Sequence, residues 1–155
     1  MTAKEILQSE VAEAFRDYLI ATGQRQTRER FAILRAAYDI EGTFTIDTLS
    51  EVMNQHRFHV STATLYQTMQ LLVEANLLIR HPLSSSCAVF ERIDDRRARC
   101  YQVCSCCHSV KRLRSKALTM GIDAYYPRSF TPTHRILYVY GTCNKCLRKQ
   151  KAKNN

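Results

Sequence analysis

The sequence predicts an α+β protein of two small domains, a winged helix-turn-helix followed by a small α/β domain with a four-cysteine zinc site. Three observations carry this prediction. Apolar residues recur at helical spacing through the first half of the chain. Two short β-rich runs follow, and two CxxC pairs enclose the strand-rich remainder.

The first half begins with three helices, each with a recognisable start or stop. Residues 4–22 carry an apolar residue every four positions, and Gly23 is placed to end this helix. Thr27 can cap a second helix over residues 28–40, which Gly42 closes, and Thr45 can cap a short third one. The apolar positions expected to face the core are Leu7, Val11, Phe15, Leu19, Phe31, Leu34, Tyr38, Ile46, Leu49, Val52 and Met53.

A fourth helix and a hairpin complete this half. Ser61 precedes a helical pattern over residues 62–78, and Asn76 suits the left-handed position that ends a helix. The runs LLIR and CAVFERI, separated by HPLSSS, indicate a β-hairpin. This order is that of a winged helix-turn-helix, whose last helix enters the DNA major groove. The helix is expected to face the core with Leu65, Met69, Leu72 and Val73.

Beyond residue 93 the pattern changes. DDRRAR is polar and aperiodic, which indicates a linker, whereas RCYQVC, SVKRLR and RILYVYG alternate as strands do, with an interrupted helix in SKALTMGIDAYY. We therefore expect a winged-helix domain over 1–93, a hinge over 94–98 and a second domain over 99–147. Residues 148–155 are expected to be a solvated, frayed basic tail.

Composition and charge limit the class of protein. The hydrophobic fraction of 45% and charged fraction of 24% are typical of a soluble globular chain. No apolar run approaches the ~20 residues of a membrane span, and the N-terminus lacks the pattern of a signal peptide, so we expect a cytoplasmic protein without membrane association. A net charge of +9, from 23 Lys and Arg against 14 Asp and Glu, favours a polyanionic partner such as nucleic acid.

The cysteines predict a metal site. Cytoplasmic thiols are kept reduced, so seven cysteines argue against a disulfide framework and in favour of metal or redox chemistry. The pairs Cys104-x-x-Cys107 and Cys143-x-x-Cys146, 35 residues apart, supply four thiolates for tetrahedral zinc. Four cysteines leave no open position, so we expect one structural Zn²⁺ per subunit, which stabilises a small domain.

Three further cysteines leave alternatives open. The run CSCC also contains the pairs 104/106 and 106/107, but only 104/107 has the two-residue spacer of the second pair. We expect Cys87, Cys100 and Cys106 to be inert non-ligands, because free cysteine is usually buried. A redox pair or a sensor thiol is the alternative.

Several motifs, taken in order, resemble the ferric uptake regulator family. They are GQRQTRER at 23–30, STATLYQT at 61–68, AVFE at 88–91, the first CxxC, and His134-x5-Tyr140-Gly141-x-Cys143-x-x-Cys146. The resemblance covers about residues 10–147, and the combined order and spacing are specific. It implies a homodimeric transcription regulator, a repressor, with an N-terminal winged helix, a hinge and a C-terminal α/β dimerisation domain that holds the zinc.

The resemblance also implies which residues contact double-stranded DNA. Arg25 stands where a basic residue enters the minor groove, and Tyr66 where the recognition helix meets bases. Arg30 and Arg80 stand at phosphate-positioning places. Tyr66 lies off the apolar stripe of its helix, so we expect it to be exposed; core packing is the alternative. The start of the recognition helix contributes Ser61, Thr62 and Thr64.

One of these positions departs from the family. Gln67 stands where the family usually has Arg. Glutamine pairs bidentately with adenine more naturally than with guanine, so we expect an A·T-rich inverted repeat whose sequence differs from the family's usual operator.

The resemblance fails where family members sense a divalent metal. The expected His, Asp and His fall on Arg99, Cys100 and Tyr101, and the hinge histidine falls near Thr43. Two carboxylates fall on Arg112 and Thr119. Glu91 and His134 do stand at family ligand positions, but two ligands do not make a competent site. We therefore expect the regulatory metal sites to be absent or weakened and the structural zinc to be kept.

Two hypotheses for regulation follow. Arginines at positions 96, 97, 99 and 112 put positive charge where a metal would neutralise carboxylates, and would hold a closed dimer that binds DNA; solvated linker charges are the alternative. A haem effector would need a thiolate or an imidazole. The candidates by ligand type are Cys87, Cys100, His56, His59 and His81.

Other classes of protein fit less well. A zinc deaminase would need a glutamate two residues after a ligand histidine and an open coordination position. A thiol oxidoreductase would need one exposed CxxC near a βαβ unit, so we do not expect an enzyme. A zinc-ribbon interaction module without DNA binding would leave the helical half of the chain unexplained.

Overall fold

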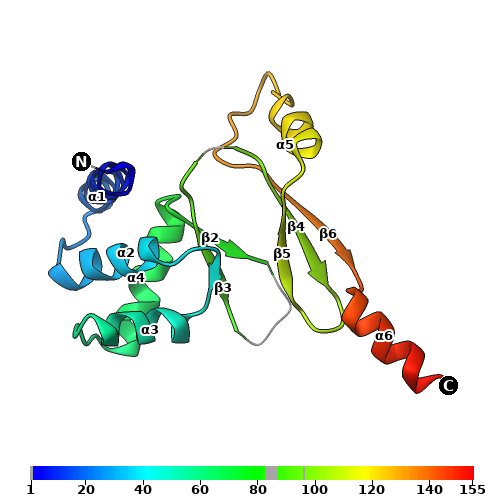
Figure 1. The fold of residues 1–155 in the computed structure, drawn as a ribbon. Coiled ribbons are helices and arrows are strands. Elements are labelled where there is room, and N and C mark those ends of the chain that lie inside the picture. Colours follow the sequence, from blue (N-terminus) through cyan, green and yellow to red (C-terminus); the bar gives the residue numbers. More distant parts are fainter. Residues whose placement is uncertain (1, 83–86, 96) are drawn as a thin grey trace. The chain divides into compact units, whose positions relative to one another are not determined.

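The computed structural model describes residues 2–82, 87–95 and 97–155, which form two compact units, Met1–Asp94 and Asp95–Asn155. Figure 1 shows the helices α1 to α4 in the first unit and the sheet of β4, β5 and β6, with α5 and α6, in the second. The α+β class is confirmed. Each unit is described by itself.

The first unit contains four helices that begin where the sequence places a hydroxyl side chain. Thr27, Thr45 and Ser61 each accept a hydrogen bond from the backbone N–H three residues ahead, which satisfies one of the free donors at a helix start. These three caps confirm the prediction. The helices are α1 (Ala3–Ala21), α2 (Arg28–Asp39), α3 (Ile46–Gln55) and α4 (Thr62–Glu74).

Three of these helices end in a residue with positive φ. Gly23 (φ 67°) follows α1 and Asn76 (φ 56°) follows α4, as predicted, and Arg57 (φ 55°) follows α3. At each end the next N–H donates back to the carbonyl five residues earlier; the Leu77 N–H reaches Leu72 O at 2.9 Å. This pair of features defines a Schellman motif. The motif provides hydrogen-bond donors to carbonyl groups of the last turn that have no partner within the helix.

A three-stranded sheet of order β1-β3-β2 forms the wing beside the helices. The predicted hairpin is confirmed as β2 (Leu78–His81) paired antiparallel with β3 (Val89–Arg92). The sequence analysis missed β1 (Thr43–Phe44), which pairs with the other edge of β3 through Thr43↔Glu91 and Phe44↔Phe90. Two residues are too few to show the alternation that predicts a strand. Their pairing partner lies far along the chain, so the sequence alone does not indicate β1.

The core of the first unit joins all four helices to the wing. Phe15, Leu19, Ile33, Leu49 and Leu72 are completely buried. The Tyr38 hydroxyl lies 2.7 Å from the carbonyl oxygen of Leu77 and 2.9 Å from that of Ile93, so it ties α2 to the ends of the hairpin. Most residues predicted to face inward are buried; Leu7, Phe31, Val52 and Val73 are half-buried and pack against this core.

The second unit is a small sheet with two helices. Its strands β4 (Arg99–Cys104), β5 (Val110–Leu113) and β6 (Ile136–Gly141) have the order β5-β4-β6. Strand β5 is antiparallel to β4, whereas β6 is parallel to β4. A parallel neighbour requires a crossover, and that connection holds α5 (Lys116–Asp123), whose first turn is capped by Ser115.

The end of the chain differs from the expectation of a frayed tail. Residues Asn144–Lys153 form a continuous helix, α6, which extends from the end of β6 (Figure 1). Only Cys146 is buried along it, so the basic side chains are solvated as expected, but the backbone is helical. Lys, Arg, Gln, Leu and Ala are all good helix formers and no Gly or Pro interrupts them. No helix among the described residues is long and apolar enough to cross a membrane.

Candidate metal centre and nucleic-acid interface

The parallel pairing of β4 with β6 brings the two CxxC pairs together. In that register Cys104, the last residue of β4, lies opposite Gly141, the last residue of β6. The chain turns sharply after each strand, through His108 at φ 58° on one side and into α6 on the other. Cys143 is the residue before α6 and Cys146 lies in its first turn. Both CxxC pairs therefore lie at the same end of neighbouring strands.

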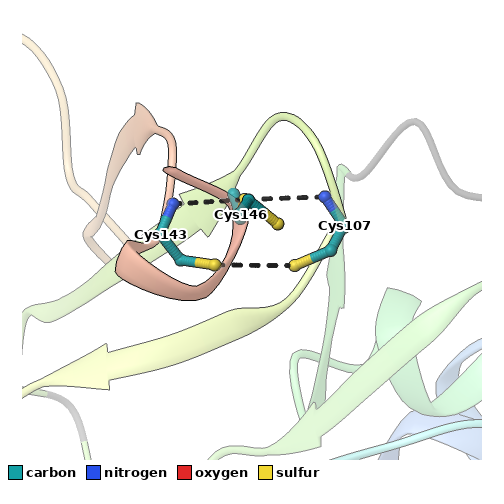
Figure 2. A group of neighbouring side chains, drawn as sticks. Cys107, Cys143 and Cys146 are labelled. Atoms are coloured by element: carbon teal, nitrogen blue, oxygen red, sulfur yellow. Dashed lines mark hydrogen bonds between the residues drawn. The ribbon is translucent and has the colours of Figure 1, made fainter. Parts of the chain in front are cut away.

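The four thiols form a compact group. The sulfur atoms of Cys104, Cys107, Cys143 and Cys146 all lie within 4.8 Å of one another. Figure 2 shows the sulfurs of Cys107 and Cys143 facing each other, at 3.9 Å. Among the described residues this is the one group of three or more His, Cys, Asp or Glu side chains close enough to share a metal ion.

Backbone N–H groups favour the thiolate form at one of these cysteines. The N–H of Cys143 lies 3.4 Å from Cys104 Sγ, and that of Cys107 lies 3.5 Å from it. These hydrogen bonds lower the pKa of Cys104 to about 6. The Ser109 side chain and backbone lower the pKa of Cys107. Metal ligation requires thiolates, so the loop is arranged for it.

Crowding has the opposite effect on the fourth thiol. The neighbouring sulfurs, first that of Cys143, raise the pKa of Cys146. Four thiolates this close repel one another, and a divalent cation at their centre removes that repulsion. Four soft sulfur ligands on two CxxC turns fit tetrahedral zinc and leave no open coordination position. The group thus fits a structural zinc site, and Cys104, Cys107, Cys143 and Cys146 are the residues that would hold the ion.

The remaining three cysteines lie outside this group. Cys100 is completely buried in β4, and burial raises the pKa of its thiol. Cys87 and Cys106 are exposed. Burial therefore supports an inert thiol at Cys100, whereas Cys87 and Cys106 lack the burial on which that expectation was based.

Three of the residues expected at DNA lie around the exposed side of α4. Tyr66 is 55% exposed and Gln67 is also exposed, so the alternative of Tyr66 in the core is wrong. Arg80 is exposed in β2 between buried neighbours. Tyr66, Gln67 and Arg80 line one hollow of about 480 Å³ together with Phe90 of β3. The structure thus places the helix face and the wing around one surface.

The other residues expected at DNA lie at the start of α4 and in or next to the loop before α2. Ser61 and Thr62 are exposed, and Thr64 Oγ1 lies 2.8 Å from Ser61 Oγ. Arg25 is exposed in the loop before α2. The Arg30 guanidinium donates to the backbone carbonyl of Arg25, so Arg30 also shapes the loop that presents Arg25.

The comparisons with known proteins agree with this arrangement. The sequence model of the ferric uptake regulator family matches residues 21–140. The chain belongs to the ferric uptake regulator family. Among curated relatives, a ferric uptake regulation protein of Campylobacter upsaliensis is 24% identical over 144 residues, which cover 91% of this chain and 92% of that one.

Solved structures of the family have the same fold. The ferric uptake regulator of Pseudomonas aeruginosa, solved with manganese, matches with a TM-score of 0.66 at 21% identity, over 83% of this chain and 97% of that one. A zinc uptake regulator solved with zinc and DNA matches with a TM-score of 0.52 at 18% identity, over 97% and 99%. The family resemblance seen in the sequence is confirmed.

Three consecutive positions where the resemblance predicts sensing ligands, 99–101, hold buried side chains in this ferric uptake regulator family member, whereas Thr43 is exposed and Thr119 is half-buried. Tyr101 is completely buried and stacks on Tyr138, with ring centroids 5.6 Å apart. Arg99 is 3% exposed, so the alternative of a solvated linker charge is wrong for it. Arg97 and Arg112 are exposed, and Arg96 lies outside the described residues.

The two retained family ligand positions lie in different units. Glu91, in β3, is buried with its Oε2 3.0 Å from His81 Nε2. His134 is exposed in the second unit, its Nδ1 3.2 Å from Thr133 Oγ1. Of the histidines considered for haem, His81 is thus engaged in the wing, His59 contacts Asn54 at 2.9 Å, and His56 is exposed.

Proposed function

We propose that this chain is a cytoplasmic, homodimeric repressor that binds double-stranded DNA through its winged helix. The observation that carries this proposal is the exposed pair Tyr66 and Gln67 on α4, beside Arg80 of the wing and around one hollow. Exposed aromatic and amide side chains on a recognition helix read base edges, whereas an exposed arginine on the wing positions the phosphates. The solved complex of a zinc uptake regulator with zinc and DNA supports this assignment.

The contacts divide by role. Tyr66 and Gln67 read bases in the major groove, and Arg25 enters an A·T-rich minor groove, whose negative potential suits a cation. Arg30 and Arg80 bind phosphates, and Ser61, Thr62 and Thr64 at the start of α4 donate to the backbone. A homodimer with two such surfaces selects an inverted repeat.

The homodimer is supported by apolar side chains on the second unit. Tyr125, Tyr126 and Phe130 are 69%, 75% and 66% exposed in the connection between α5 and β6, and Met120 of α5 is 61% exposed. Several large aromatic side chains with so much exposed area are typical of a protein interface rather than of the surface of a monomer. The second unit therefore serves as the dimerisation domain.

Among the described residues, the regulatory metal of the family has no complete ligand set. Glu91 is engaged by His81, and Tyr101 and Arg99 are buried at positions where ligands are expected. We propose that DNA binding needs the structural zinc but no second metal, with arginine charge in place of the ion. A mobility-shift titration in a chelator that spares the four-cysteine zinc tests this: loss of binding that only iron or manganese restores would contradict it.

The DNA-binding proposal is tested by selecting duplexes from a random pool with the full zinc-loaded chain. We expect an enriched inverted repeat, and a drop of about tenfold or more in affinity for it in Tyr66→Ala or Gln67→Ala. Glu13→Ala, on the exposed side of α1, is the control and should bind normally. A pool that yields no enriched sequence would favour an interaction module without sequence-specific DNA binding.

A further inference from the structure

The net positive charge of this protein comes from the second unit. Residues 95–155 contain fourteen of the 23 Lys and Arg but only two of the fourteen Asp and Glu, a formal charge of +12. Residues 1–94 contain the other nine basic and twelve acidic residues, a formal charge of −3. A zinc ion with four thiolates lowers the charge of the second unit by two and leaves it strongly basic. The second unit, and not the unit that contains the winged helix, therefore provides the long-range electrostatic attraction for a polyanion.

Helix α6 concentrates this charge on one surface. Lys145, Lys149 and Lys153 follow at steps of four, so they line one side with a rise of about 6 Å per step, and Arg148 lies beside them. We call these four residues the α6 basic face. The helix contains no acidic residue, and among the described residues no acidic side chain pairs with any of its cations.

The base of α6 is held by the zinc ligands. Cys143 precedes its first turn and Cys146 is buried within that turn, so a metal bound to the four thiols fixes the helix start. Figure 1 shows the helix continuing outward from the end of β6. Cations in its last turn, Lys151 and Lys153, also interact favourably with the negative end of the helix dipole. The basic face thus lies on a fixed element rather than on a frayed tail.

Basic and neutral polar groups continue from α6 onto the sheet. A hollow of about 360 Å³ is lined by Thr142 and Asn144 at the helix start and by Gln102 and Lys111 on β4 and β5. None of its lining residues is acidic. The amide, hydroxyl and ammonium groups all suit phosphate oxygens.

We propose that the α6 basic face and Lys111 form a second DNA-binding surface, which contacts the phosphate backbone of duplex DNA without reading sequence. This proposal rests on the proposed function, which already brings the chain to DNA. Lysine suits such a role because it acts as a point charge on phosphate. A membrane surface fits less well, since α6 has no broad apolar face beside Leu147 and Ala152.

The test measures binding of the full zinc-loaded chain to random-sequence duplex DNA by fluorescence anisotropy, between about 50 and 200 mM salt. Each phosphate contact contributes about 0.9 to the slope of log affinity against log salt. We expect the variant K145Q/K149Q/K153Q to lower the magnitude of that slope by about three and the low-salt affinity by about tenfold or more. The variant K145R/K149R/K153R should retain both.

A matched variant separates this surface from net charge. R114Q/K116Q/R128Q removes the same three charges from exposed positions of the second unit outside α6, and should change the slope by less than about one. Equal slopes for the two triple variants would overturn the proposal. So would a larger effect of the α6 variant on binding to an RNA hairpin or to phosphatidylserine vesicles than on binding to duplex DNA.

The same assay distinguishes this proposal from the proposed function. If the winged helix reads no sequence, selection fails while random-duplex binding still depends on α6. If α6 contributes nothing, Tyr66→Ala still abolishes the preference for the selected repeat, but the α6 variant binds random duplex as the unmodified chain does.

Discussion

His81 and Glu91 form a buried pair inside the wing, with Nε2 and Oε2 3.0 Å apart and both side chains almost completely excluded from solvent. They lie on adjacent strands, where Ile79 rather than His81 is the direct partner of Glu91, so the contact is diagonal. The carboxylate that stands at a family metal-ligand position is thus tied to an imidazole of its own sheet. Its first role in this protein is to hold the hairpin together.

Replacing Glu91 should therefore destabilise the first unit. We expect Glu91→Ala to lower the free energy of unfolding by about 3 kcal/mol, because it leaves His81 buried without this partner. Glu51→Ala, on the exposed side of α3, should change it by less than about 0.5 kcal/mol. Urea denaturation measures both. Unchanged stability together with loss of a second bound metal would instead identify Glu91 as a metal ligand.

Removing one zinc ligand should unfold the second unit. In Cys146→Ser we expect the zinc content to fall from one ion per chain to near zero, because three thiolates without the fourth bind zinc far more weakly. The strands β4 and β6 should lose amide protection in hydrogen exchange, while the first unit keeps its own. Metal analysis and hydrogen exchange together measure these effects.

Cys106 is the matched control for that experiment. It lies within the same CSCC run but is exposed and outside the four-sulfur group. Cys106→Ser should keep one zinc per chain and the same thermal midpoint. A loss of zinc from Cys106→Ser with normal zinc in Cys107→Ser would mean that the first pair is assigned wrongly.

The left-handed residue after α4 allows a backbone prediction. Asn76→Val should destabilise the first unit by about 1–2 kcal/mol, because a β-branched side chain is strained at φ 56°. Asn76→Gly should be neutral or slightly stabilising, since glycine adopts this conformation freely. The thermal unfolding midpoint of Asn76→Val should therefore lie below that of Asn76→Gly. Equal midpoints would show that the Schellman turn is not maintained.

The identity of residue 67 should set one base of the operator. Gln67→Arg is expected to shift the preferred base contacted by this position from adenine to guanine, with a discrimination of about 1–3 kcal/mol. Selection with the variant and the unmodified chain in parallel measures the change. An identical selected sequence for both would mean that residue 67 does not read a base.

Local signals predicted most of the fold. Hydroxyl residues before apolar runs marked the starts of α2, α3 and α4, and Gly23 and Asn76 marked two ends, because capping depends on neighbours in sequence. The spacing of the CxxC pairs likewise predicted a shared site, since two residues between ligands give a turn around one ion.

The features that could not be predicted from the sequence depend on contacts between segments far apart in the chain, or on where a helix begins and ends. The pairing of Phe44 with Phe90 and the contact of His81 with Glu91 require the folded sheet, and no periodicity in either segment announces them. Residues 148–155 are predicted to be a frayed tail because they are nearly all polar, but residues 148–153 belong to α6. Its helical propensity was present in the sequence, but the zinc ligands at its start give it a fixed origin.

The parallel pairing of β4 with β6 also sets an order of events as the chain is made. At a synthesis rate of about 5–20 residues per second, Cys143 follows Cys107 by roughly 2–7 s. During that interval the nascent chain contains only two of the four cysteines of the metal site, Cys104 and Cys107. The site is complete only after the crossover through α5, strand β6 and the first turn of α6 have been made, so full metal coordination comes late in biogenesis.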